Sequence, residues 1–199
     1  MASPVVPLLI AAGIAAAVSA GLALNNARAR QRLERIRATW KAHAAGHGMR
    51  FVPSAADLAP YLDPQSPGLR AEVHGVEIDA SVLTEQKTTR VEAALPSVDS
   101  TFRVVFVKRG EEAPAGLVDA PTGNKAFDAA YGLFTNDADL ARSILDRRLA
   151  HLVLSFPRKE AKLEAAGNRF VLSWPGVETD LVALDAGLSL VSQACRRRA

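Results

Sequence analysis

Two histidines four positions apart, His43 and His47, are the first residues whose spacing could support chemistry. Side chains at i and i+4 share one helix face, and zinc peptidases present two of their metal ligands in this way. Such peptidases place a glutamate between the histidines as general base, whereas the residues here are Ala-Ala-Gly. Gly46 and Gly48 also indicate that the helix ends there. We interpret both histidines as solvated polar residues near a helix terminus and predict no metal site.

The segment from Gly116 to Lys125 superficially resembles a phosphate-binding loop. Such a loop has four residues between its glycines, followed by Lys and then Ser or Thr at the start of a helix. Here six residues separate Gly116 from Gly123, and Asn124 stands between the second glycine and the lysine. The segment is therefore predicted to be an ordinary loop, and no cofactor is expected.

Asp128, directly after Phe127, is the carboxylate of most interest. On an apolar strand it could accept hydrogen bonds from backbone N–H groups of the preceding loop, with Arg90 as its ion-pair partner. A catalytic role would need a second acid or a nucleophile, and the sequence places neither beside it. We favour the structural role and predict no catalytic residues. Cys195, the single cysteine, excludes an intrachain disulfide and is interpreted as a buried thiol.

Periodicity predicts the elements that position these residues. Alternating apolar residues predict strands, and apolar residues at helical spacing predict helices. Asn136 offers an N-cap for a helix that runs to Phe156, and Ala166-Gly167-Asn168 is typical of a hairpin turn. The predicted strands are 76–82, 89–93, 102–107, 127–134, 159–165 and 169–174, and the predicted helices are 25–48, 136–156 and 181–195.

Strands in hairpin-length succession favour an α+β fold with a mainly antiparallel sheet, helices on one face and a C-terminal helix. Six or seven short strands followed by a helix also fit a pleckstrin-homology-like barrel, which is the alternative. The predicted organisation has four parts: an N-terminal membrane anchor (1–24), a basic juxtamembrane helix (25–50), a linker loop (51–68) and a soluble domain (69–199).

The first 24 residues contain no charged side chain. The run from Pro4 to Leu24 would form a helix of about 31 Å, which matches the hydrocarbon thickness of a bilayer. A cleaved signal peptide is the alternative, but it would carry basic residues before the apolar run, and none is present. An uncleaved single-pass anchor is therefore expected.

A cluster of basic residues follows the apolar run directly. The positive-inside tendency places such residues in the cytoplasm, and anionic lipid head groups attract them. The sequence thus predicts a bacterial inner-membrane protein with its N-terminus outside and its C-terminal domain in the cytoplasm, where a lone cysteine is also at home. The residues expected at the membrane surface are Arg28, Arg30, Arg32, Arg35, Arg37 and Lys41.

The sequence pI of 9.3 hides a segregation of charge. Residues 25–50 hold seven basic side chains and one acidic side chain, whereas residues 51–195 have a net charge of −6. A nucleic-acid-binding face needs clustered basic residues on the folded domain. Because the domain is acidic, no nucleic-acid partner is expected.

Three short patterns occur in order along the chain: Trp40-x-x-x-Ala44 leading to Gly48-x-x-Phe51, then Thr88-Thr89-Arg90-Val91-Glu92-Ala93, then Gly123-Asn124-x-x-Phe127-Asp128. Together they resemble uncharacterised bacterial membrane-anchored proteins in which a helix after the membrane span precedes a β-rich domain. In those proteins an acidic residue is expected where Asn124 stands here. The resemblance covers residues 40–174 and implies an architecture without implying an activity.

Three functions remain open from the residues. The first is an interaction or scaffold domain displayed to a protein partner, because no coherent catalytic constellation is present. The second is a membrane-tethered hydrolase or ligand-binding domain with its site near Asp128, which would require a deep pocket with convergent polar groups. The third is a lipid-sensing barrel, which would require a basic rim facing the bilayer.

Overall fold

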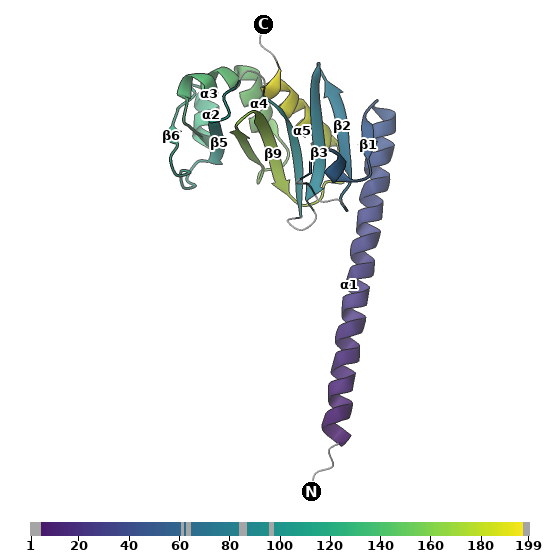
Figure 1. Cartoon of the computed structure of the whole chain (residues 1–199). Coiled ribbons are helices and arrows are strands. Elements are labelled where there is room, and N and C mark those ends of the chain that lie inside the picture. The colour runs from purple at the N-terminus through teal and green to yellow at the C-terminus, as the bar shows by residue number, and fades with distance from the viewer. Residues whose placement is uncertain (1–4, 61, 63–64, 84–86, 96–97, 197–199) are drawn as a thin grey trace.

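The computed structural model describes residues 5–60, 62, 65–83, 87–95 and 98–196; within residues 5–20 it describes the backbone, and the side chain of Ser19 only. Five α-helices and a short 3-10 turn lie in the described part of the chain (Figure 1). They are α1 (Val5–Gly46), η1 (Ala55–Asp57), α2 (Lys125–Ala130), α3 (Ala138–Ile144), α4 (Arg147–Ser155) and α5 (Leu181–Cys195).

The strands form one sheet in which every neighbouring pair is antiparallel. The strands are β1 (Arg50–Val52), β2 (Gly68–Val73), β3 (Val76–Leu83), β4 (Thr88–Ala94), β5 (Arg103–Lys108), β6 (Val118–Asp119), β7 (Tyr131–Thr135), β8 (Lys162–Ala166) and β9 (Arg169–Pro175). Their order is β1-β2-β3-β4-β9-β8-β5-β7-β6. The α+β class with an antiparallel sheet is confirmed. The barrel alternative is wrong, because the described sheet is open, with β1 and β6 at its two edges.

The strands with the clearest alternation form where the sequence predicts them. β3 and β4 pair in register, with Ala80 opposite Val91, and β8 and β9 form the predicted hairpin. Gly167 in that hairpin has a φ of +61°, the left-handed conformation that a tight turn requires and glycine adopts without strain. β5, the most apolar strand, lies between β8 and β7.

Two predicted elements differ in the structure. The interval 127–134 is not one strand, because Asn124 caps the short helix α2 and the strand β7 begins only at Tyr131. The helix predicted from 136 to 156 is two helices, because Asp146 acts as a second N-cap and α4 begins after it. The cap of α3 is Asp137, whose side chain accepts a hydrogen bond from the Leu140 N–H, while Asn136 bonds to the backbone of Arg103 and Thr101.

The segment 51–68, predicted as a linker, is largely irregular but joins the sheet at both ends. β1 pairs with β2 along the edge of the sheet, and β2 begins at Gly68. Ala55, Ala59 and Leu62 form a small buried cluster of their own. A Cβ at Gly68 would press on the Leu58 side chain and lie 3.3 Å from the Ala80 carbonyl oxygen, so this segment packs closely on the sheet.

The main core lies between the sheet and the helices α2, α4 and α5 on one of its faces. α5 packs on β2, β3, β4 and β9, while α4 packs against α5 and α2. Leu172, Leu184 and Trp174 are among the fully buried side chains of this core. Gly187 lets α5 approach the sheet closely, because a Cβ there would lie 3.2 Å from the Trp174 ring.

α1 is one continuous helix whose C-terminal part docks on the β1–β2 edge and whose N-terminal part projects away from the domain (Figure 1). Ile36, Trp40 and Ala44 are buried, so this face of the helix contacts the domain. The Trp40 side chain is fully buried. Across the described residues, no helix combines the length and apolar character needed to cross a bilayer. Most of the predicted anchor, 1–24, has side chains outside the described residues.

Candidate functional site

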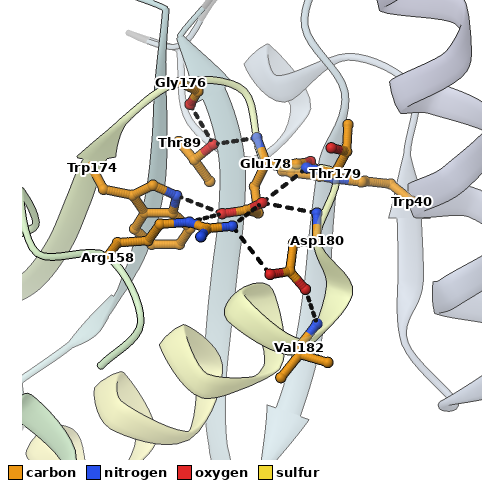
Figure 2. A network of polar contacts seen from close by, with 9 residues as sticks. All are labelled: Trp40, Thr89, Arg158, Trp174, Gly176, Glu178, Thr179, Asp180 and Val182. Carbon is orange, nitrogen blue, oxygen red and sulfur yellow. Dashed lines mark hydrogen bonds and ion pairs between the residues drawn. The ribbon is translucent and has the colours of Figure 1, made fainter. Parts of the chain in front are cut away.

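The densest polar cluster in the described chain is centred on Glu178, in the connection between β9 and α5. Its carboxylate accepts five hydrogen bonds (Figure 2). Arg158 donates two of them, from Nε to Oε2 and from Nη2 to Oε1, each at 2.8 Å. The Trp174 indole N–H donates to Oε2 at 2.9 Å, and the backbone N–H groups of Thr179 and Asp180 donate to Oε1. We call these residues, with Trp40 and Thr89, the Glu178 cluster.

The environment of Glu178 keeps its carboxylate ionised. Burial alone raises the pKa of this carboxyl, since the side chain is only 5 % exposed. The hydrogen bonds from Arg158, Asp180 and Trp174, together with the charge of Arg158, outweigh burial, so the pKa lies below the ordinary glutamate value. The same contacts raise the pKa of Arg158. The pair is therefore charged on both sides across the physiological range.

The backbone of Glu178 connects α1 and β4 to the same point. The Trp40 indole N–H on α1 donates to the Glu178 carbonyl oxygen at 3.0 Å. The Glu178 N–H donates to Thr89 Oγ1 on β4, and the Thr89 hydroxyl in turn donates to the Gly176 carbonyl, both at 2.9 Å. Asp180 binds Arg158 and caps α5 through the Val182 N–H (Figure 2). One glutamate thus joins α1, β4, β9, the α4–β8 connection and α5.

The number of hydrogen bonds that the Glu178 carboxylate already accepts limits what the cluster can do. A carboxylate offers about four lone-pair positions, and five donors occupy them here. No acceptor position is left for a substrate or a transferred proton. The cluster therefore holds elements in place, and its chief consequence is the fixed attachment of α1 to the domain.

A second cluster brings His43 and His47 of α1 to Asp185 of α5. Their nearest potential ligand atoms lie within 4.8 Å of one another. His43 Nε2 is 2.8 Å from Asp185 Oδ1, which is shorter than the separation of about 3.3 Å between two ligands on a tetrahedral zinc ion. The geometry is that of a direct hydrogen bond between a buried histidine and a half-exposed aspartate. These three residues could hold a metal only if the His43–Asp185 contact opened.

Asp128 lies in the first turn of α2 and closes the loop before it. Oδ1 accepts from the Thr122 N–H and hydroxyl, and Oδ2 accepts from the Gly123 N–H, at 2.8–3.0 Å. Burial raises the pKa of Asp128, but these hydrogen bonds and the charge of Arg109 outweigh it, so the pKa lies below the ordinary value. The structure does not bring Asp128 and Arg90 together: Arg90, on β4, donates to Glu92 on the same strand.

The basic residues of α1 lie in several different environments. Arg28 and Arg32 line a groove between α1 and the domain. Arg30 and Arg35 are exposed elsewhere on the helix. Arg37 donates to Glu34 and to the Gln65 carbonyl, and Lys41 lies 13 residues beyond Arg28, about 20 Å along the helix axis. The structure therefore gives these six side chains different surroundings.

The Glu178 cluster cannot be predicted from the sequence, because its residues are far apart along the chain. Trp40, Thr89 and Arg158 lie 138, 89 and 20 residues from Glu178, and no local pattern links them. The only local signal is Glu178-Thr179-Asp180 before an apolar helical stripe, which is typical of a helix start. The three patterns noted in the sequence contain residues of these sites. Trp40 and Thr89 belong to the Glu178 cluster, and Asn124 and Asp128 form hydrogen bonds that fix the turn into α2.

Comparisons with known proteins add a fold. No family model and no curated protein matches the chain. The crystal structure of the mycobacterial trehalose monomycolate transport factor A, TtfA, is similar at 17 % sequence identity and a TM-score of 0.57. The match covers 79 % of this chain and 91 % of TtfA. At that identity the likeness concerns architecture, and the chain is therefore one that shares the fold of TtfA.

Proposed function

We propose that this chain is a single-pass membrane protein that holds a non-catalytic α+β domain at the cytoplasmic face of a bacterial inner membrane and presents it to a protein partner. The observation that carries the proposal is the attachment of α1. The helix runs without a break from the apolar stretch to the buried Trp40, whose indole is bonded to the Glu178 carbonyl. A helix anchored this way transmits the position of the membrane to the domain.

The apolar part of α1 supports the membrane anchor. The sequence up to Leu24 lacks charged side chains, and six basic residues follow within 17 positions. Leu22 and Leu24 are described and are 59 % and 60 % exposed, which suits residues that face lipid. The hydrolase alternative has less support, because both oxygens of Asp128 already accept hydrogen bonds from the loop that it closes.

The sheet face opposite α5 is the surface that we assign to the partner. Arg70 and Asp79 form an ion pair on this face, and Glu92 pairs with Arg90 and Arg169. Further along the same face, Lys162 and Glu164 of β8 are exposed. The carboxylates of the ion pairs are buried, and their arginine partners, 24–37 % exposed, are the groups of these pairs that this face presents.

The shared fold narrows the choice of partner. Because TtfA is named as a transport factor for trehalose monomycolate, we propose that the partner is a membrane component of lipid transport. The fold likeness supports this step, and the scaffold role does not depend on it.

Site-specific photocrosslinking in intact cells tests the proposed function. A photoreactive residue at Glu164, on the open face, should give one discrete adduct with a membrane protein. The same residue at His151, exposed on α4 behind the sheet, is the matched control and should give none. Equal adducts from both positions, or none from either, would contradict the scaffold role.

Membrane topology is tested separately. A C-terminal fluorescent fusion should be bright and a C-terminal alkaline phosphatase fusion inactive, because the domain is placed in the cytoplasm. Activity of the phosphatase fusion would overturn the proposed orientation.

A further inference from the structure

A groove of about 360 Å³ lies between α1 and the membrane-proximal end of the domain. One wall is α1, with Arg28, Arg32 and Leu33 among its lining residues. The other wall is made by Val82 at the end of β3, by Lys87 before β4, and by Val177 between β9 and α5. The groove is thus built from segments far apart in the sequence, and α1 has to be docked for it to exist.

The chemistry of the lining is amphipathic. Arg28, Arg32 and Lys87 are exposed cations, whereas the partly exposed Leu33 and Val177 supply apolar surface, with the buried Ile36 and Val82 behind them. The described residues that line the groove include no acid. Arg28 and Arg32 are one helical turn apart and lie on the same side of α1. One guanidinium group can donate two parallel hydrogen bonds to the oxygens of a phosphate. Two such groups beside an apolar wall therefore suit a phosphate group that is attached to an apolar chain.

The position of the groove specifies where such a ligand would come from. Asn25, the residue that follows the apolar run, already lines the groove. On the proposed orientation the groove therefore lies at the level of the lipid head groups. We propose that it binds one anionic phospholipid of the cytoplasmic leaflet, with the phosphate held by Arg28, Arg32 and Lys87 and the first part of an acyl chain against Leu33 and Val177.

This inference rests on the proposed membrane anchor and goes beyond general attraction to a charged surface. Surface attraction depends on the number of charges and their distance from the lipid, at about 1 kcal/mol for each basic residue. It does not distinguish Arg28 and Arg32 from Arg30 and Arg35. A built site does, because only the first pair lines the groove.

The test uses the full chain in nonionic detergent micelles, titrated with phosphatidylglycerol and, in parallel, with phosphatidylcholine. The groove variant is Arg28→Gln, Arg32→Gln and Lys87→Gln, and the control Arg30→Gln, Arg35→Gln and Lys41→Gln removes the same charge elsewhere. We expect saturable binding of phosphatidylglycerol at one molecule per chain. Affinity should fall about tenfold or more in the groove variant and less than about threefold in the control. Equal losses, or equal binding of both lipids, would overturn the proposal.

A second pair of variants leaves the charge unchanged. Ala29→Trp places an indole in the groove, whereas Ala27→Trp places one on exposed helix outside it. Lipid binding should be lost in the first variant and kept in the second, with equal thermal stability. Binding in both would contradict the assignment of the groove.

Two further arms separate the possible explanations. Inorganic phosphate at millimolar concentration should not displace the lipid, because it lacks the apolar part; displacement would indicate a plain anion site and overturn the lipid assignment. Membrane fractionation of the groove variant should be unchanged, since anchoring belongs to residues 1–24. A chain that binds lipid in micelles but does not fractionate with membranes would contradict the proposed function and leave the groove standing.

Discussion

At the scale of single residues, Glu178 is the side chain on which most of the long-range connections converge. Its carboxylate binds Arg158 and Trp174, and its backbone binds Trp40 and Thr89. A buried charge is costly to bring out of water, and only full pairing makes it tolerable. Removing one partner should therefore cost more than the isolated pair contributes, because the other charge is left without compensation.

Glu178→Gln should lower the free energy of unfolding by about 2–3 kcal/mol at neutral pH, since one acceptor oxygen is replaced by an NH2 donor that faces other N–H donors and Arg158 loses the charge of Glu178. The variant should also change the response to acid. The pKa of Glu178 in the folded chain is lower than the ordinary value of 4.5, so the unfolded chain binds this proton more readily. The stabilisation is then complete well above pH 4.5 and is lost as the pH falls through the lower, folded value.

Urea unfolding between pH 3 and 7 measures this difference. The wild-type chain should lose stability toward acid more steeply than Glu178→Gln. The exposed Glu160→Gln is the control and should follow the wild-type curve. Parallel curves for wild type and Glu178→Gln would show that the carboxylate is not held ionised by the fold.

Cys195 should be inert in the folded chain. Burial raises the pKa of its thiol to about 12, so at pH 8 only about one molecule in ten thousand carries the reactive thiolate. A disulfide-exchange reagent should label Cys195 on the timescale of unfolding and immediately in denaturant. Stoichiometric labelling of the native protein within minutes would contradict the buried position of this side chain.

At the scale of elements, the attachment of α1 depends on Trp40. Trp40→Phe keeps an aromatic ring in the core but leaves the Glu178 carbonyl without its indole donor, which should cost about 1 kcal/mol. Trp40→Ala also removes a large buried side chain and should cost about 3–5 kcal/mol. Hydrogen exchange checks the location: amides of residues 36–46 should exchange faster in both variants, whereas those of β8 and β9 should not. Uniformly faster exchange would mean that α1 and the sheet unfold as one unit.

The elements that could be predicted are those whose own side chains carry a long, regular pattern. β3 alternates from Val76 to Val82, and α5 has an apolar stripe that ends in Cys195. α2 has only six residues, too few for a helical period to show, and its capping residue Asn124 is the signal that was available. The break between α3 and α4 cannot be predicted from apolar spacing, because that spacing continues across it. The N-cap Asp146 is the local signal of the break.

The candidate sites could be predicted in part for the same reason. Asp128 accepts hydrogen bonds from residues no more than six positions away, so its structural role could be predicted from the local sequence. The local sequence predicts a solvated His43, which is wrong: the side chain is buried and contacts Asp185, 142 positions away, through tertiary packing that no local pattern encodes. The Glu178 cluster and the groove are assembled by tertiary packing of segments that share no sequence pattern.

At the scale of the whole molecule, the basic cluster and the acidic domain occupy different parts of the chain. The basic residues of α1 follow the apolar run, from Arg28 to Lys41, whereas residues 51–195 carry a net charge of −6. An anionic membrane would attract the first and repel the second. If the proposed membrane anchor holds, this repulsion would keep the acidic domain from lying flat on the lipid.

The continuity of α1 has a rotational consequence. Each helical residue turns the chain by about 100° and lifts it by about 1.5 Å. Two alanines inserted between Leu24 and Asn25 would turn the domain by about 200° relative to residues 1–24, the proposed anchor, while four would leave it only about 40° out of phase although they lift it twice as far. If a partner contacts both the bilayer-embedded helix and the sheet, the crosslink from position 164 should be lost with two extra residues and largely regained with four. A loss that grows steadily with insertion length would instead mean that distance from the membrane, and not helical phase, governs the encounter.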